Sequence, residues 1–343
     1  MSDHAWGNNR ILTFLPEARQ LKKAYHDDSI PFTPPRFLSI WISQICNLDC
    51  TYCFFGESNH DKSKTFIPTE PMLNWLREIK NFGAESLEFS GGGEPSLHKD
   101  FGRFIEETHA MGYAQGLITH ACNEKLPVEL LAKNLKYVRV GLDAATAGTH
   151  DAIKQNKKKD FWFYVAIENI KKLVALRTDG FTIGIKVVLN KINVHEFEMI
   201  VELADELNVD YVQIKSEHSS VNSLTDEEKS DAQKHAMRIA LRVKNVKVLC
   251  NLFHQKATTY CFMSPIHTVV TATGDILQCC FFEDRPVGTI FQPIKEVWGG
   301  RQHREVMRKT TVKECSKVDC RWNGYNSKMK EILEDPLASM SFI

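Results

Sequence analysis

The alternation of strand-like and helix-like segments constrains the fold of this chain most. Short apolar runs rich in β-branched residues take turns with longer stretches whose apolar residues recur at helical spacing. The strand-like runs are 37–43, 86–90, 116–119, 137–144, 181–190 and 211–215. The helical stretches that follow them are 71–82, 100–112, 126–135, 161–176, 194–208 and 225–243. Six β-then-α units in order predict a parallel sheet, because parallel neighbours need a crossover connection.

Two parallel architectures accommodate six such units: an open doubly wound sheet and an incomplete β/α barrel. Periodicity alone does not separate them, and in both the active residues lie where strands end and loops begin. The alternation stops after about residue 245, where a cysteine-rich tail follows a last strand-like run. We therefore predict a lead-in over 1–36, a core domain over 37–252 and a tail domain over 253–343.

Charge and hydropathy exclude several classes of protein. Lys+Arg and Asp+Glu both number 43, so the formal net charge is zero and an overall basic field for nucleic acid is absent. No apolar run is long enough to span a bilayer, and the first residues lack the pattern of a secretion signal. The cytoplasm is the expected location. Disulfides are rare there, so the ten cysteines need another explanation.

Three cysteines follow the first strand-like run directly. Cys46, Cys50 and Cys53 have the spacing C-x3-C-x2-C within one loop. Zinc sites usually take four nitrogen or sulfur ligands. Three thiols in one loop suit a [4Fe–4S] cluster in which the protein holds three irons and the fourth stays open to another ligand. The alternatives are a zinc clip and buried hydrophobic filling.

The cysteine loop resembles the signature of radical S-adenosylmethionine (radical SAM) enzymes. In that signature an aromatic residue precedes the third cysteine, as Tyr52 does here. The segment SGGGEPSL at 90–97 follows the second strand-like run and resembles the family's GGEP motif. The matching residues are Gly92, Gly93, Glu94 and Pro95. The resemblance covers residues 37–250 and implies a partial (β/α)6 barrel of the TIM type.

This resemblance implies a chemistry and its cofactors. The open iron binds the amino and carboxylate groups of S-adenosylmethionine. One electron from the reduced cluster then cleaves this cofactor to a 5′-deoxyadenosyl radical, which takes a hydrogen atom from a C–H bond. The glycines let the backbone approach the methionine end of the cofactor, and Glu94 accepts from its ammonium. A flavodoxin- or ferredoxin-type protein is the expected reductant.

Three further residues are expected to contact S-adenosylmethionine by the same resemblance. Thr119 ends the third strand at a position similar to the family's TNG segment, although this chain reads THACN. Asp143 is similar to the aspartate of the SLD segment, with Gly141 in place of the serine. Lys186, on the fifth strand, could pair with the carboxylate of the cofactor. A solvent-facing or core-edge role is the alternative for each.

The tail contains a second group of cysteines. Cys261 and Cys279 are separated by a turn at Gly274, and a hairpin there would bring the two thiols together. Cys315 and Cys320 would complete a four-cysteine site. The pattern resembles the short auxiliary-cluster domain, called twitch, of the SPASM branch of radical SAM enzymes, and so implies one auxiliary [4Fe–4S] cluster.

Two alternatives remain for the tail. Cys280 stands beside Cys279 and could replace it as a ligand. A zinc ion held by four thiolates is the other possibility, because the spacing is less distinctive than that of the first group.

Two thiols and two polar residues are candidates for catalysis. Cys250 ends the last strand-like run and Cys122 follows the third. In radical SAM epimerases a cysteine returns a hydrogen atom to the substrate radical, so Cys250 is a candidate donor and Cys122 its rival; inert filling is the alternative. Glu217 and His218 follow the sixth strand and could bind a polar substrate or act as a base, or form a loop salt bridge.

The favoured function is epimerisation or dehydrogenation of a small polar molecule, such as an amino sugar or a sugar-bearing natural product. In the dehydrogenation the auxiliary cluster accepts an electron. A peptide-modifying radical SAM maturase is the alternative, although 36 lead-in residues are too few for the leader-peptide-binding domain that many such enzymes carry. A zinc-stabilised binding protein is a third hypothesis, against which the cysteine spacing and the GGEP segment argue.

Overall fold

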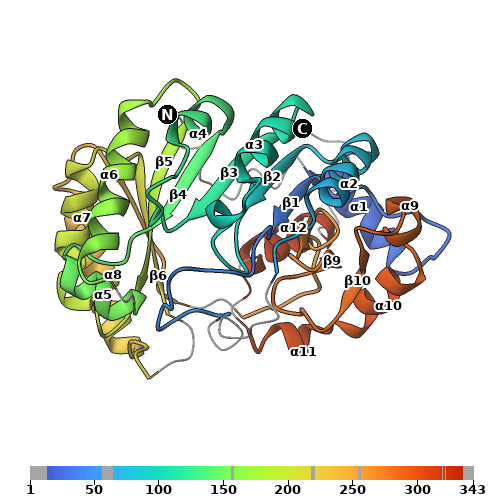
Figure 1. The fold of residues 1–343 in the computed structure, drawn as a ribbon. Coiled ribbons are helices and arrows are strands. Elements are labelled where there is room, and N and C mark those ends of the chain that lie inside the picture. Colours follow the sequence, from blue (N-terminus) through green and yellow to red (C-terminus); the bar gives the residue numbers. More distant parts are fainter. Residues whose placement is uncertain are drawn as a thin grey trace. The chain divides into compact units, whose positions relative to one another are not determined.

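A computed structural model describes residues 14–55, 65–155, 158–217, 221–253, 256–318, 320 and 322–334 (Figure 1). The chain divides into two compact units. The first, here called the tail unit, comprises Met1–Ser39, Asn74–Ser86 and His254–Ile343. The second, the barrel unit, comprises Ile40–Leu73 and Leu87–Phe253. The predicted division at residues 36 and 252 stays a prediction.

Parallel strands and their crossover helices build the barrel unit. Its strands are β3 (Ala114–Thr119), β4 (Tyr137–Gly141), β5 (Thr182–Leu189), β6 (Tyr211–Ser216) and β7 (Lys247–Cys250), with the ends of β1 (Phe37–Ile40) and β2 (Ser86–Phe89). They follow one another in chain order, and the ladders from β3 to β7 are parallel. The α/β partial-barrel prediction is therefore confirmed.

Helices cover one face of these strands. They are α3 (Phe101–Ala110), α4 (Val128–Asn134), α5 (Ala147–Lys154), α6 (Phe161–Ala175), α7 (Phe197–Glu206) and α8 (Asp226–Ala240). Helices α5 to α8 lie along one side of strands β4 to β6 in Figure 1. Of these six, α5 is the one that the periodicity of the sequence does not predict.

The two faces of the parallel sheet differ in polarity. Successive residues of a strand point to opposite faces, and in-register neighbours share a face. Val140, Ile185 and Val212 are in register across β4, β5 and β6, and each is at most 1% exposed. On the opposite face, Lys186 of β5 is in register with Gln213 of β6, and both are partly exposed. The apolar face packs on the helices, and the other face, here called the polar face, remains for ligands.

A polar layer fills the amino-terminal end of the polar face. Tyr137 donates a hydrogen bond to Glu88, and Arg139 donates to the Tyr211 hydroxyl at 3.0 Å. The Arg139 guanidinium lies 5.7 Å and 6.0 Å from the centroids of these two tyrosine rings. Gly184 faces the Tyr211 ring so closely that a Cβ atom would overlap it. Side chains thus occupy this end of the face, which leaves the carboxyl-terminal end of the strands for a ligand.

The tail unit combines a small antiparallel sheet with short helices. β8 (His267–Val270) pairs with β9 (Asp275–Leu277), which pairs with β10 (Pro286–Thr289). The predicted hairpin is confirmed: its turn closes through a hydrogen bond from Gly274 N–H to Thr271 O, with Gly274 at φ +89°. The helices are α1 (Leu15–Ala24), part of α2 (Thr69–Phe82), α9 (Ile294–Val297), α10 (Arg301–Lys309), α11 (Val312–Cys315) and α12 (Asn323–Glu334). In neither unit do the described residues include a helix with the length and apolar character to cross a membrane.

Candidate active site

The three thiols of the first cysteine group lie close together in the loop after β1. The pKa of Cys46 is raised to about 12, mainly by burial and in smaller part by Glu94 and the nearby thiols of Cys50 and Cys53. Burial likewise raises the pKa of Cys50 to about 11. Thiols crowded in this way favour the protonated form until a metal centre stabilises their thiolates. The donor set fits an iron–sulfur cluster, and the assignment of each ligand stays a prediction.

The carboxyl end of α5 anchors the cysteine loop. The carbonyl oxygens of Ile153 and Lys154 accept hydrogen bonds from Thr51 N–H at 2.9 Å and Asp49 N–H at 3.0 Å. The last carbonyl groups of a helix have no N–H partner within the helix. The N–H groups of the cysteine loop supply that partner, and the loop gains two anchoring hydrogen bonds. A further hydrogen bond joins the cysteine loop to the loop after β3: the side-chain amide of Asn47 donates to the backbone oxygen of Cys122 at 2.9 Å.

The GGEP segment packs against the backbone at the start of the cysteine loop. Gly92 has φ +78°, and a Cβ atom there would lie 2.8 Å from the carbonyl oxygen of Ser43. A Cβ atom on Gly93 would overlap the carbonyl oxygen of Ile45. Glu94 N–H donates to the same oxygen at 2.9 Å. The two glycines are therefore needed for the close approach of the two motifs, which the structure brings together.

Hydrogen bonds from β3 and the loop after it hold the Glu94 carboxylate. Its Oε1 accepts from the Thr119 hydroxyl at 2.7 Å and from Ser96 N–H at 3.1 Å. Its Oε2 accepts from His120 N–H at 3.1 Å and lies 3.3 Å from His120 Nε2. Burial lowers the pKa of His120, and its Nδ1 accepts from Cys122 N–H at 2.9 Å, so the neutral ring carries its proton on Nε2. Thr119 thus orients Glu94, and His120 is a supporting residue that the sequence analysis missed.

A buried charge cluster joins the cysteine loop to β4. Asp143 accepts from the Tyr52 hydroxyl at 2.6 Å, from Val188 N–H at 2.7 Å and from the Lys154 ammonium. Lys154 is only 2% exposed, and it also donates to the Tyr52 hydroxyl at 3.0 Å. The structure thus brings together the predicted residues Tyr52 and Asp143. Lys186 lies on the polar face, in register with Gly141 at the end of β4.

The two candidate hydrogen donors have different surroundings: Cys122 interacts with Glu94 and the thiols of Cys46 and Cys50, whereas Cys250 ends β7. Cys122 is fully buried, with its Sγ 3.3 Å from the carbonyl oxygen of His120 and 4.0 Å from Nε2 of His150. Cys250 is in register with Ile214, which is fully buried on the face that packs on the helices. Their role as donors stays a prediction, and the register does not favour it for Cys250.

Glu217 extends β6 by one residue. Its N–H donates to Leu189 O at 3.1 Å, which continues the ladder with β5. It therefore falls on the face of Gln213 and Lys215, near the carboxyl ends of the strands. His218, the other candidate at this position, lies outside the described residues.

Four thiols of the tail unit line one pocket. They are Cys261, Cys279, Cys315 and Cys320, and the aromatic rings of Phe281, Phe282 and Trp322 share the lining. Among the residues that the structure describes, no three His, Cys, Asp or Glu side chains converge closely enough to hold a single metal ion. Four thiols around one pocket fit the four-thiolate ligation of a [4Fe–4S] cluster.

Donors from α12 and the following turn surround the first of these thiols. Cys261 Sγ accepts from Ser264 N–H at 3.2 Å and from the Asn326 amide at 3.5 Å. The Asn326 side-chain oxygen also accepts from Phe262 N–H at 2.9 Å and from Met263 N–H at 3.2 Å. N–H groups aimed at sulfur stabilise a thiolate, so Asn326 is a supporting residue of the auxiliary site that sequence spacing did not reveal.

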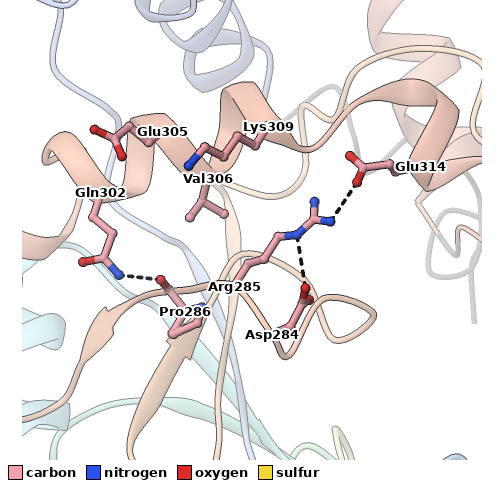
Figure 2. A pocket seen from close by; sticks show the side chains of 8 residues that line it. All are labelled: Asp284, Arg285, Pro286, Gln302, Glu305, Val306, Lys309 and Glu314. Atoms are coloured by element: carbon pink, nitrogen blue, oxygen red, sulfur yellow. Dashed lines mark hydrogen bonds and ion pairs between the residues drawn. The ribbon is translucent and has the colours of Figure 1, made fainter.

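An ion pair joins two of the cysteine-bearing segments of the tail unit (Figure 2). Arg285, which follows Cys279 by six residues, donates to Glu314 at 2.7 Å, and it also pairs with Asp284 at 3.4 Å. Glu314 directly precedes Cys315 and closes a capping box with Thr311 at the start of α11. The pair links the loop after Cys279 to the helix that carries Cys315.

Comparison with known proteins identifies both parts of the chain. Residues 40–204 match the family model of the radical SAM superfamily, and residues 261–321 match that of the SPASM iron–sulfur cluster-binding domain. The chain belongs to the radical SAM superfamily and carries a SPASM domain. This radical SAM enzyme therefore uses S-adenosylmethionine, a [4Fe–4S] cluster in its core and auxiliary iron–sulfur binding in its SPASM domain.

Solved structures share the fold of this radical SAM enzyme. SuiB from Streptococcus suis is 17% identical with a TM-score of 0.65, and the match covers 86% of this chain and 72% of that one. SuiB bound to S-adenosylmethionine is 16% identical with a TM-score of 0.67, covering 89% and 74% of the two chains. Native anSMEcpe with bound AdoMet is 17% identical with a TM-score of 0.63, covering 84% and 87%. At these identities the likeness concerns the fold.

Replacing each of the adjacent tail cysteines tests the auxiliary ligand set. Cys279 lines the pocket, and a hydrogen bond with Cys280 raises its pKa, so the two thiols touch. We expect the Cys279→Ala variant to hold about four irons per chain after anaerobic reconstitution, and the Cys280→Ala variant to hold about eight. Iron and sulfide analysis measures both. The reverse pattern would make Cys280 the ligand.

Proposed function

We propose that this radical SAM enzyme abstracts a hydrogen atom from a carbon that bears a hydroxyl or amino group in a small polar molecule, such as an amino sugar or a sugar-bearing natural product, and dehydrogenates it. When bound, the core cluster with S-adenosylmethionine supplies the adenosyl radical, and an oxidised auxiliary cluster supplies an electron acceptor. The residues proposed above would hold them: Cys46, Cys50 and Cys53 in the core, and Cys261, Cys279, Cys315 and Cys320 in the tail.

The polar face supports a polar substrate. At the carboxyl ends of the strands it carries Lys186, Gln213 and Lys215, all partly exposed. A ligand without polar groups would desolvate these side chains, which costs free energy. Carboxylate, hydroxyl and amine groups on the ligand would instead pair with them. In this scheme Lys186 binds the carboxylate of the cofactor, which leaves Gln213 and Lys215 for the substrate.

The observation that carries the proposal is the buried carboxylate of Glu217. It is 1% exposed, and among the described residues neither of its oxygens forms a hydrogen bond of normal geometry. Burial raises the pKa of Glu217. The nearby amide of Asn190 lowers this pKa, but by less than burial raises it. Buried polar groups normally have good partners, so a carboxylate on this face for which the described residues offer only the weak contact with Asn190 suits a ligand that donates hydrogen bonds.

Glu217 has a defined task in the proposed reaction. Loss of a hydrogen atom from the substrate leaves a carbon radical with its hydroxyl intact. The hydroxyl proton then moves to the Glu217 carboxylate and one electron leaves, so that the C–O single bond becomes C=O. A raised pKa makes the carboxylate a better base for this step. Epimerisation would require a hydrogen donor instead, and the register of Cys250, in line with Ile214 on the face that packs on the helices, does not favour it for that role.

Turnover in D2O tests the reaction. The reduced holoenzyme, with flavodoxin or ferredoxin as the expected electron source, is offered a panel of amino sugars and, separately, short peptides. Formation of 5′-deoxyadenosine that rises with an amino sugar, together with a product two hydrogens lighter and free of deuterium, is expected. A product of unchanged hydrogen count that carries one solvent deuterium would establish epimerisation and overturn dehydrogenation.

A matched pair of variants tests the role of Glu217. The Glu217→Gln variant is expected to form product about 10²- to 10⁴-fold more slowly, the usual contribution of a general base, while still cleaving S-adenosylmethionine. The control is Glu202→Gln, because Glu202 is an exposed residue of α7. Product formation at the normal rate by Glu217→Gln would contradict the assignment.

A peptide substrate is the second candidate. SuiB has been solved bound to the precursor peptide SuiA, and anSMEcpe with bound AdoMet and the Cp18Cys peptide. Both share the fold of this chain, so a peptide on the polar face is compatible with the architecture. Stimulation of 5′-deoxyadenosine formation by peptides alone would favour this candidate over the amino sugar.

A further inference from the structure

Lys154 is a buried lysine whose side chain contacts two residues proposed to act at the core cluster. Its side chain is 2% exposed, and that of Asp143, with which it pairs, is 1% exposed. Its ammonium also donates to the Tyr52 hydroxyl at 3.0 Å and lies 5.4 Å from the centroid of the Tyr52 ring. A buried lysine with these partners keeps its positive charge.

The backbone of the same residue holds the cysteine loop. The carbonyl oxygens of Ile153 and Lys154 accept from Thr51 and Asp49, which flank Cys50 on either side. Lys154 therefore fixes the loop twice: by its carbonyl oxygen next to Cys50 and by its ammonium at Tyr52. Loss of the side chain would remove the second of these attachments and leave the first.

The ammonium also acts on a proposed ligand sulfur, that of Cys50. Cys50 and Lys154 are close enough to influence each other electrostatically; Lys154 is buried and Cys50 is partly buried. In such surroundings the interaction between charges is screened far less than at the surface. Reduction adds one negative charge to a cluster, and a fixed positive charge beside one of its ligands favours the reduced form. Asp143, which also acts on Cys50, opposes this effect in part.

We infer that Lys154 is a positioning residue of the core site: it orients Tyr52 and the cysteine loop, and its charge raises the reduction potential of the core cluster. This inference rests on the radical SAM assignment and not on the proposed substrate. It gives a function to a charged group whose burial the fold alone does not require, since an apolar side chain of similar length would fill the same space.

The test is an EPR-monitored redox titration of the anaerobic holoenzyme. The part of the reduced signal that changes when S-adenosylmethionine is added reports the core cluster, and the rest reports the auxiliary site. In the Lys154→Met variant, the equilibrium constant for reduction of the core cluster is expected to fall about tenfold, which corresponds to about 59 mV for one electron. The Lys154→Arg variant is expected to recover most of this loss. The Lys133→Met variant, at an exposed lysine of α4, is the control and should leave the potential unchanged.

A second variant keeps the test decisive if Lys154→Met does not fold. Lys154→Met combined with Asp143→Asn removes both charges, leaves no unpaired ion and keeps a hydrogen-bonding partner for Tyr52. A core potential lower than that of the wild type, with the auxiliary signal unmoved, supports the inference in either variant. A folded variant with about eight irons and an unchanged core potential would overturn it, as would an equal shift in the Lys133→Met control. Neither the reduction potential nor the iron content is measured with a substrate present. Failure of the proposed dehydrogenation would therefore leave this result intact.

Discussion

The Gly93→Ala variant is expected to retain about four irons per chain instead of about eight, and to lose cleavage of S-adenosylmethionine. A Cβ atom at this position would overlap the carbonyl oxygen of Ile45 and lie 2.7 Å from the carbonyl carbon of Gln44. Both belong to the backbone that leads into the cysteine loop, so no flexible side chain can move aside. The loop must shift, and Cys46 shifts with it. Iron analysis and detection of 5′-deoxyadenosine after reduction measure the two effects.

The Gly148→Ala variant is the matched control for this substitution. Gly148 lies in α5, and a Cβ atom there would meet no atom within 4 Å. Alanine is a better helix former than glycine by up to about 1 kcal/mol, so this variant should keep its iron and be as stable as the wild type or more so. A Gly93→Ala protein with full iron content and normal cofactor cleavage would show that the close approach of the two motifs is not required.

The Asp143→Ala variant is expected to lower the free energy of unfolding by about 3–5 kcal/mol. Removing this carboxylate leaves the Lys154 ammonium buried without its counter-charge, and it also removes the acceptor for Tyr52 and for Val188 N–H. Anaerobic urea denaturation followed by circular dichroism measures the change. The large effect follows from the unpaired charge, because the intact pair itself contributes little net stability.

Two comparisons separate the unpaired charge from other causes. Glu168→Ala breaks the ion pair with Lys171 on α6, in which both side chains are more than half exposed, and should leave stability nearly unchanged. Asp143→Asn combined with Lys154→Met removes both buried charges and should be more stable than Asp143→Ala alone. If the double variant is no more stable than Asp143→Ala, the loss comes from packing or hydrogen bonds and not from the charge.

Local sequence pattern predicted the architecture well. Strands and helices of the barrel unit follow the alternation of apolar runs and helical spacing, because burial of one face imposes that periodicity on each element. The exception is α5, a helix of eight residues with a threonine at its N-cap, Thr146. Eight residues make only about two turns, which is too short for a helical periodicity to stand out. The residue that ends it, Lys154, was therefore missed.

The sequence by itself determined which groups can do the chemistry. Three sequence features indicated the family and its cofactors: the spacing of Cys46, Cys50 and Cys53, the GGEP segment, and the cysteines of the tail. The type of ligand and its local spacing can be read from the sequence without knowledge of the fold. It also predicted the hairpin between Cys261 and Cys279, since a turn needs only its own residues.

Tertiary structure alone decided how these groups are supported. From the sequence alone, Lys154 would be taken for a surface lysine. In the folded chain it contacts Asp143 and Tyr52, which are 11 and 102 residues away along the sequence. The register of β6 and β7 put Cys250 in line with Ile214, on the face that packs on helices, which no pattern within one strand can reveal. Burial, partner and facing direction depend on segments distant in sequence, so the support of the site emerges only when the chain has folded.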